Sequence, residues 1–195
     1  MKTNIRTGSI LLLFLLSFLS AISGAQQKLD QLIVYGEGFM FSVKESADWS
    51  GDTQNALKFG ANVVLHEKGQ PLDSYTGLIR VKANEKTDEN LAADMRADMK
   101  DCKSKYSKVQ FRDFALDCSH SHCLAKVFYI PGEFYEYVTY VNPGPKSKII
   151  FSVSLNSEKS KASPKEIEAY RKTTESLTLL SADVRLSGAT SPPTH

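Results

Sequence analysis

The residues with the clearest chemical potential form one short run, Cys118-Ser-His-Ser-His-Cys123. Its two thiols could close a disulfide. Together with His120 and His122 they are also ligand types that bind zinc or copper. The two uses compete, because a metal requires both thiols to be reduced. Thiol redox chemistry is less favoured, since the spacing is C-x4-C rather than C-x-x-C and no helix N-terminus follows to lower a thiol pKa.

The position of this run between two expected strands favours the disulfide. Strand patterns at residues 109–117 and 123–130 make residues 119–122 a four-residue hairpin loop. Cα atoms of antiparallel partners lie about 4.5–5.5 Å apart, which is within the range that a disulfide requires. We therefore expect a Cys118–Cys123 disulfide. A zinc or copper site at Cys118, His120, His122 and Cys123 is the alternative, and no other cofactor is expected.

The N-terminal segment indicates export. Lys2 and Arg6 precede a short apolar run, and Ser23-Gly-Ala25 offers small residues before Gln26. This pattern is typical of a secretory signal peptide, and the run is short for a membrane span. An exported chain meets an oxidising compartment, periplasmic or extracellular, which also favours the disulfide.

The third cysteine, Cys102, is expected to stay free. It completes an apolar helical stripe with Leu91, Met95 and Met99, at spacings of 4, 4 and 3. The strand that follows the helix would carry Cys118 and Cys123 to the far end of the sheet, beyond bridging distance. We interpret Cys102 as a small buried apolar residue rather than a nucleophile.

No catalytic residues are predicted. The sequence has no G-x-S-x-G elbow and no phosphate-binding glycine pattern. Glu133 and Glu136 are an odd number of residues apart, so on one strand they would lie on opposite faces and could not form an acid/base pair. His66 is interpreted as a strand-edge residue and Trp49 as a plug at the edge of the core.

The remaining pattern predicts an antiparallel sheet with helices on both faces. Strands are expected at residues 32–35, 38–43, 62–65, 76–82, 109–117, 123–130, 133–141 and 149–155. Pro131-Gly132 and residues 142–145 are short turns, so the last four strands form a meander. On its third strand, Tyr135, Tyr137, Thr139 and Val141 share one face, and Phe134, Glu136, Val138 and Tyr140 share the other.

Two amphipathic helices accompany the strands, and a weaker helical signal covers residues 52–59. The first helix is expected at residues 88–104 with Thr87 as its cap. The second begins with a capping box in which Ser163 is the N-cap, Pro164 is N1 and Glu166 is N3. Its buried stripe is expected to be Ile167, Tyr170, Thr174 and Leu177.

Composition indicates one domain. The expected organisation is a signal peptide at residues 1–25, a lead-in at 26–37, an α/β domain at 38–181 and a disordered tail at 182–195. Residues 1–25 hold two basic and no acidic residues, so the mature chain would carry 22 of each and a formal charge of zero. A neutral chain has no bulk electrostatic attraction to nucleic acid or to anionic lipid.

The order of elements resembles the PsbP-like superfamily, which includes many small exported bacterial proteins. The matching features are Phe39-Met-Phe-Ser-Val43 followed by Trp49, two strands, a helix, the meander and a last helix ending in Glu175-Ser-Leu177. They span residues 38–180. The resemblance implies an α+β fold, an α/β/α sandwich with a central antiparallel sheet, and a protein that binds or scaffolds rather than catalyses.

These observations predict an exported soluble domain that is not an enzyme. Its partner would be a protein or a small ligand held at one sheet edge or at the loop end, with no nucleic acid and no membrane after signal cleavage. The alternative is a metal-binding or thiol-redox protein that uses the Cys118–Cys123 run.

Overall fold

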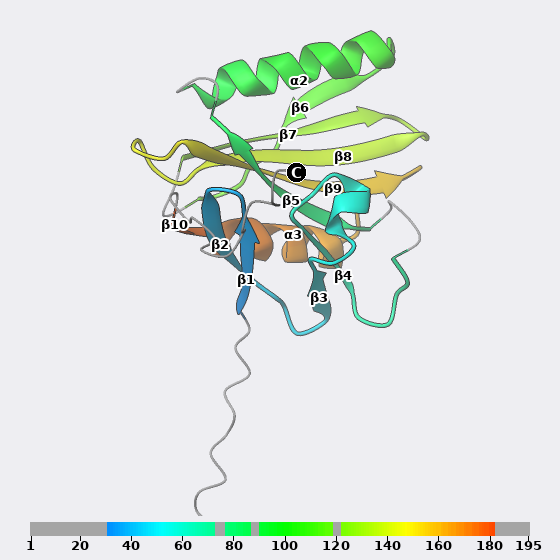
Figure 1. The fold of residues 1–195 in the computed structure, drawn as a ribbon. Coiled ribbons are helices and arrows are strands. Elements are labelled where there is room, and N and C mark those ends of the chain that lie inside the picture. The colour runs from blue at the N-terminus through cyan, green and yellow to red at the C-terminus, as the bar shows by residue number, and fades with distance from the viewer. Residues whose placement is uncertain (1–30, 73–76, 87–89, 119–121, 182–195) are drawn as a thin grey trace, which may run out of the picture.

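The computed structural model describes residues 31–72, 77–86, 90–118 and 122–181, which form two antiparallel sheets and two α-helices (Figure 1). The expected signal peptide, residues 26–30, the Thr87 cap, His120 and the expected tail lie outside these ranges. Within them, no helix is both long and apolar enough to cross a membrane.

The larger sheet has seven strands in the order β3-β4-β5-β9-β8-β7-β6. The bounds are β3 Trp49–Asp52, β4 Val63–Glu67, β5 Ile79–Glu85, β6 Gln110–Asp113, β7 His122–Ile130, β8 Phe134–Asn142 and β9 Ile149–Glu158. Strands β6 to β9 are consecutive neighbours, so the predicted meander is confirmed. The first half of the sheet joins the meander through the antiparallel pair β5–β9.

The smaller sheet brings together segments near both ends of the described chain. It consists of β1 Gln31–Gly36, β2 Phe39–Lys44 and β10 Thr178–Ser181, with β2 in the centre. The strand predicted at residues 32–35 is thus confirmed. The sequence pattern gave no indication of β10.

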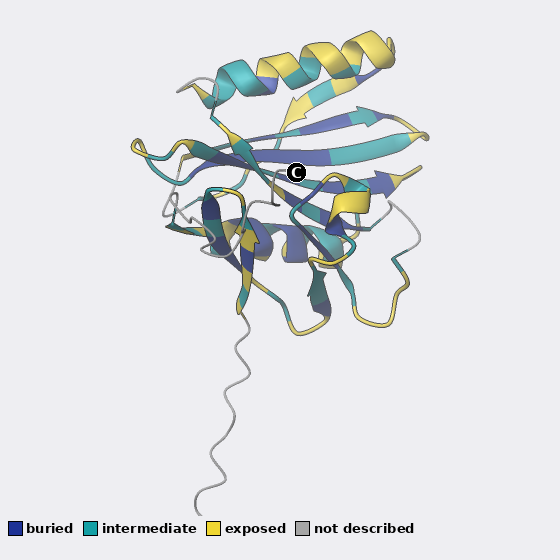
Figure 2. Ribbon diagram, in the orientation of Figure 1, coloured by how far each residue is buried: buried dark blue, intermediate teal, exposed yellow. Residues whose placement is uncertain are grey.

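Helix α2, Leu91–Lys105, lies over β7 and β8 on one face of the large sheet, at the top of Figure 1. Its N-cap is Asn90, whose side chain accepts a hydrogen bond from the Ala92 amide. The helix therefore begins three residues later than expected. Its predicted apolar stripe packs against the side chains of Val138 and Tyr140, while its outer face is exposed (Figure 2).

Helix α3, Pro164–Ser176, packs on the opposite face of the sheet and against β2. The Ser163–Glu166 capping box is present in both directions. Fully buried Tyr170 contributes its ring to the main core and its hydroxyl to a hydrogen bond with Thr139 at 2.5 Å. The two faces predicted for β8 are confirmed, since Thr139 points to α3 and Val138 to α2.

Several boundaries differ from the sequence prediction. Trp49 opens β3, which was not predicted, and this strand covers β4, so His66 does not lie on an edge strand. As expected, the Trp49 side chain is buried in the core. The weak helical signal is a single 3-10 turn, η2 Ala56–Phe59. Strand β5 begins three residues later than predicted, and β6 ends at Asp113 instead of residue 117.

A polar groove beside helix α2 is the candidate functional site

The predicted disulfide is present and lies at one end of the sheet. Cys118 and Cys123 are bonded, with their Cα atoms 6.1 Å apart. The prediction of a tight hairpin around them is wrong. The last hydrogen bond between this segment and β7 is donated by the Phe114 amide to the Ala125 carbonyl, and the chain then leaves the sheet. Both sulfurs are used in the bond and His120 is outside the described ranges. Among the residues that are described, no group of three or more His, Cys, Asp or Glu could hold a metal ion.

Cys102 lies at the other end of the sheet, beside the turn that joins β7 and β8. It is the free cysteine and is half-buried. Burial and, to a smaller extent, the negative charge of Glu136 raise the pKa of its thiol. A thiol with a raised pKa is protonated at neutral pH and is a poor nucleophile.

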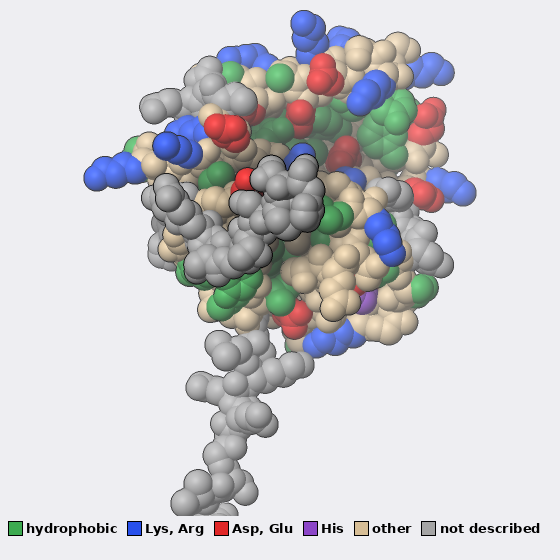
Figure 3. Space-filling view, in the orientation of Figure 1, with side chains coloured by type: hydrophobic (Ala, Val, Ile, Leu, Met, Phe, Trp, Pro, Cys, Tyr) green, Lys and Arg blue, Asp and Glu red, His purple; other side chains and the backbone are tan. Residues whose placement is uncertain are grey.

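A groove runs along the sheet beside α2, because the helix covers β7 and β8 but leaves β9 and β5 open on the same face. On this face, β5 and β9 carry the polar residues Arg80, Lys82, Asn84, Ser152, Ser154 and Asn156, together with the apolar Ile150. In Figure 3 the surface is hollowed below α2, and charged side chains lie inside the hollow. The groove contains one cavity at each end of α2.

The cavity near the C-terminal end of α2, which we call the Glu136 cavity, has a volume of about 340 Å³. Its lining residues are Cys102, Tyr106, Glu133, Phe134, Glu136, Asn156, Ser157 and Glu158. They come from α2 and its C-cap, from β8 and the turn before it, and from β9. Three carboxylates and two aromatic rings therefore meet at one site.

A polar network joins this cavity to the centre of the sheet. The Arg80 guanidinium donates to Glu136 Oε1 at 2.7 Å and to Asn156 Oδ1 at 3.0 Å. Arg80 comes from β5, and its register partner on the neighbouring strand β9 is Ser154. Its side chain therefore extends across β9 to reach Glu136 on β8. The side chains of Arg80 and Glu136 are only 18% and 29% exposed, so the pair is largely withdrawn from water.

Burial sets the electrostatics of this pair. It raises the pKa of Glu136 above the ordinary 4.5, and the adjacent Arg80 guanidinium lowers it by a smaller amount. The Arg80 Nε is buried and has no hydrogen-bond partner in the described chain. A perturbed carboxylate in a cleft is a common mark of a functional site.

Glu133 and Glu136 do not lie apart as the sequence suggested, since both line the same cavity. Glu133 belongs to the turn before β8 rather than to the strand, so strand alternation does not fix the direction of its side chain. The prediction that these carboxylates lie on opposite faces is therefore wrong.

The second cavity, which we call the Tyr140 cavity, has a volume of about 330 Å³ and lies nearer the N-terminal end of α2. The Tyr140 hydroxyl donates a short hydrogen bond to Asp98 across its wall. Burial, followed by this hydrogen bond, raises the pKa of Tyr140, which keeps the phenol protonated at neutral pH. Lys82 from β5 lies on the opposite side.

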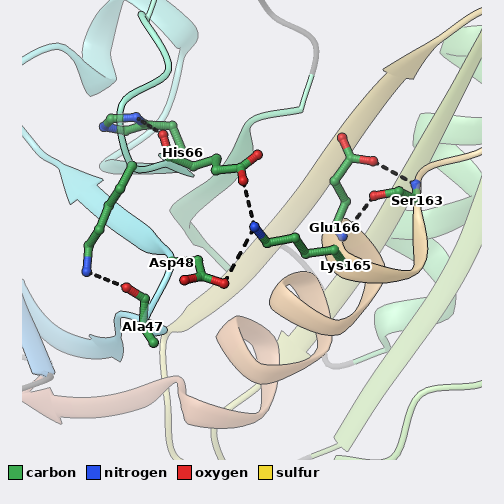
Figure 4. A network of polar contacts seen from close by, with 8 residues as sticks. Ala47, Asp48, His66, Ser163, Lys165 and Glu166 are labelled. Carbon is green, nitrogen blue, oxygen red and sulfur yellow. Dashed lines mark hydrogen bonds and ion pairs between the residues drawn. The ribbon is translucent and has the colours of Figure 1, made fainter.

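A third, smaller cavity of about 160 Å³ lies on the other face of the sheet, between Trp49 and α3. Beside it, Lys165 contacts Asp48 at 3.5 Å and Glu67 at 2.6 Å (Figure 4). These groups are about half-exposed, and exposed ion pairs contribute little to stability. The network joins the first turn of α3 to the loop before β3 and to the end of β4.

No protein-family model matches the chain, and no curated protein is significantly similar to it in sequence. Among solved structures, the chain is similar to the solution structure of cyanobacterial PsbP (CyanoP) from Synechocystis sp. PCC 6803. The TM-score is 0.48 at 11% sequence identity, and the match covers 80% of this chain and 96% of that one.

Sequence reasoning missed Arg80 and Asn156, which lie in different strands from Glu136. Within its own strand each looks like an ordinary outward-facing polar residue. The one available signal was an arginine alternating with Ile79 and Val81 on a strand that proves to be central. A charged residue on a central strand needs a partner.

Proposed function

We propose that this chain is an exported, non-catalytic binding module and that the groove beside α2 is its binding surface. The observation that carries the proposal is the Arg80–Glu136 pair, whose carboxylate lines a concave site. A largely buried ion pair is weak evidence for stability, because apolar residues of similar volume often serve as well or better. Its place beside a cavity of this size therefore favours recognition of a ligand.

The chemistry of the groove supports binding rather than turnover. Cys102 and Tyr140 both have raised pKa values, so neither is activated as a nucleophile or base at neutral pH. A nucleophile also needs a base within hydrogen-bond reach. Among the described residues that line the Glu136 cavity, Cys102 has no such partner.

The Cys118–Cys123 disulfide supports the exported location, because disulfides persist in oxidising compartments. The placement of α2 and α3 on opposite faces of the large sheet supports an α/β/α sandwich, with the small sheet added beside α3. We propose that the module acts as an accessory protein of the PsbP-like kind, whose partner is a small ligand or a side chain of another protein.

An NMR titration of the exported chain against a library of small polar compounds tests this proposal. We expect chemical-shift changes at amides of β5 and β9, and we expect Ser154→Tyr to abolish them by filling the groove floor. Glu175→Tyr, at an exposed position of α3, is the matched control and should leave binding unchanged. Binding that survives Ser154→Tyr, or steady turnover of a compound, would contradict the proposal. Circular dichroism confirms that both variants fold.

A further inference from the structure

We infer that the Glu136 cavity binds an organic ammonium group carried on an alkyl chain. This inference rests on the proposed function and names the ligand class of the same groove. It follows from the charge of the cavity, from its aromatic wall and from the spacing of its carboxylates.

The charge of the cavity is negative. Glu133, Glu136 and Glu158 line it, and no lysine or arginine is among its described lining residues. Arg80 neutralises Glu136 from below. Within the described chain, the carboxylates of Glu133 and Glu158 make no ion pair and no hydrogen bond, so two negative charges at the site are unpaired.

The aromatic wall is suited to a cation with an apolar stem. Tyr106 and Phe134 both line the cavity, with ring centroids 5.3 Å apart and planes inclined at 55°. Tyr106 is 49% exposed although it is a large aromatic residue. Ammonium groups are attracted to aromatic ring faces, and nearby carboxylates add a Coulombic attraction.

The spacing of the carboxylates favours an organic cation over a metal ion as the ligand. A divalent cation needs several oxygen ligands at about 2.0–2.6 Å from one point. No group of three acidic, histidine or cysteine side chains in the described ranges is close enough to provide them. An alkylammonium ligand does not need several oxygen atoms around one point. Its charged group and its apolar stem can occupy different parts of the cavity of about 340 Å³.

The ammonium group could belong to a free amine or to a lysine side chain of a partner protein. We therefore propose to titrate the exported chain with 1,5-diaminopentane and with a lysine-containing pentapeptide, following the amides of Phe134 and Ser157 by NMR. 1,5-Pentanediol and pentanoate are the neutral and anionic controls. We expect both amines to shift these amides and both controls to leave them unchanged. Tighter binding of the peptide would support the inference with a protein source, and tighter binding of the diamine would support it with a free amine.

Variants of the exposed carboxylates make the inference falsifiable without loss of the fold. Glu133→Gln combined with Glu158→Gln should weaken amine binding at least tenfold, and Tyr106→Leu should weaken it about two- to fivefold. Glu175→Gln on α3 should have no effect. Failure of both amines to bind, while other library compounds bind the groove, would overturn this inference and leave the proposed function intact. An amine affinity that is the same in the double variant as in the wild type would also overturn it.

Discussion

Arg80 on β5 and Glu136 on β8 form an ion pair across the intervening strand β9, with their nitrogen and oxygen atoms 2.7 Å apart. Asn156, on β9 itself, accepts a second hydrogen bond from the same guanidinium. Three strands thus contribute one side chain each to a network beside the cavity. This network links the stability of the sheet centre to the charge of the proposed site.

Removing the arginine should destabilise the fold measurably. Arg80→Met leaves Glu136 largely buried without its cation, and we expect the free energy of unfolding to fall by about 2 kcal/mol, less than for a fully buried pair. Urea denaturation measures the change. The matched control is Lys126→Met, whose partner Asp113 is 88% exposed, and its cost should stay below about 1 kcal/mol. Equal costs for the two variants would show that burial of the Arg80 pair is unimportant.

The raised pKa of Glu136 predicts a pH dependence of stability with a definite sign. Because the folded-state pKa lies above the ordinary 4.5, the folded protein binds more protons than the unfolded chain in the range between these values. Stability therefore falls as the pH rises through that range. The stability of the wild type relative to Glu136→Gln should decrease from pH 4.5 toward neutrality, as measured by urea denaturation at several pH values. A difference that stays constant or grows would contradict the raised pKa.

The disulfide should contribute modestly to stability. Cys118 and Cys123 are five residues apart, and closing so small a loop corresponds to about 2 kcal/mol in the chain-entropy description. The Cys118→Ser/Cys123→Ser variant should lose this amount in urea denaturation. Intact mass under non-reducing conditions should be two units below the reduced chain, with Cys102 as the single thiol alkylated after unfolding. Three alkylatable thiols and a bound zinc or copper ion would instead support the metal alternative.

The buried hydroxyl pair of Thr139 and Tyr170 should show strong coupling. Tyr170→Phe leaves the Thr139 hydroxyl buried without its partner, and we expect a loss of about 1–2 kcal/mol. Adding Thr139→Val removes the unpaired Thr139 hydroxyl as well. The double variant should therefore recover part of the lost free energy of unfolding. Thermal unfolding followed by circular dichroism reports both changes. Additive losses in the double variant would count against the hydrogen bond.

Much of the fold could be predicted because its signals are local. The Pro131-Gly132 turn and the Ser163–Glu166 capping box each act within a few residues, and both occur as expected. Strand β10 follows α3 after a single residue and has only four residues. From the sequence alone it cannot be distinguished from the end of the helix. Its pairing with β2, more than 130 residues away, supplies the hydrogen bonds that make it a strand.

The candidate site was less predictable because it depends on strand order. Arg80 and Glu136 are 56 residues apart in sequence, and they meet only because β9 inserts between β5 and β8. Glu133 was misplaced for a different reason, since its strand begins one residue later than the pattern suggested. A shift of one residue at the start of a strand changes which side chains share a cavity.

The pairing of β5 with β9 imposes an order on folding. Residues 79–85 find their hydrogen-bond partners in residues 149–155, so the leading half of the sheet has no template until the meander has been synthesised and aligned. Contacts between residues so distant in sequence slow folding, because a long loop must close before they form. If the chain crosses a membrane from its N-terminus, strands β3 to β5 emerge first. The backbone groups on the outer edge of β5 then have no hydrogen-bond partners until β9 follows.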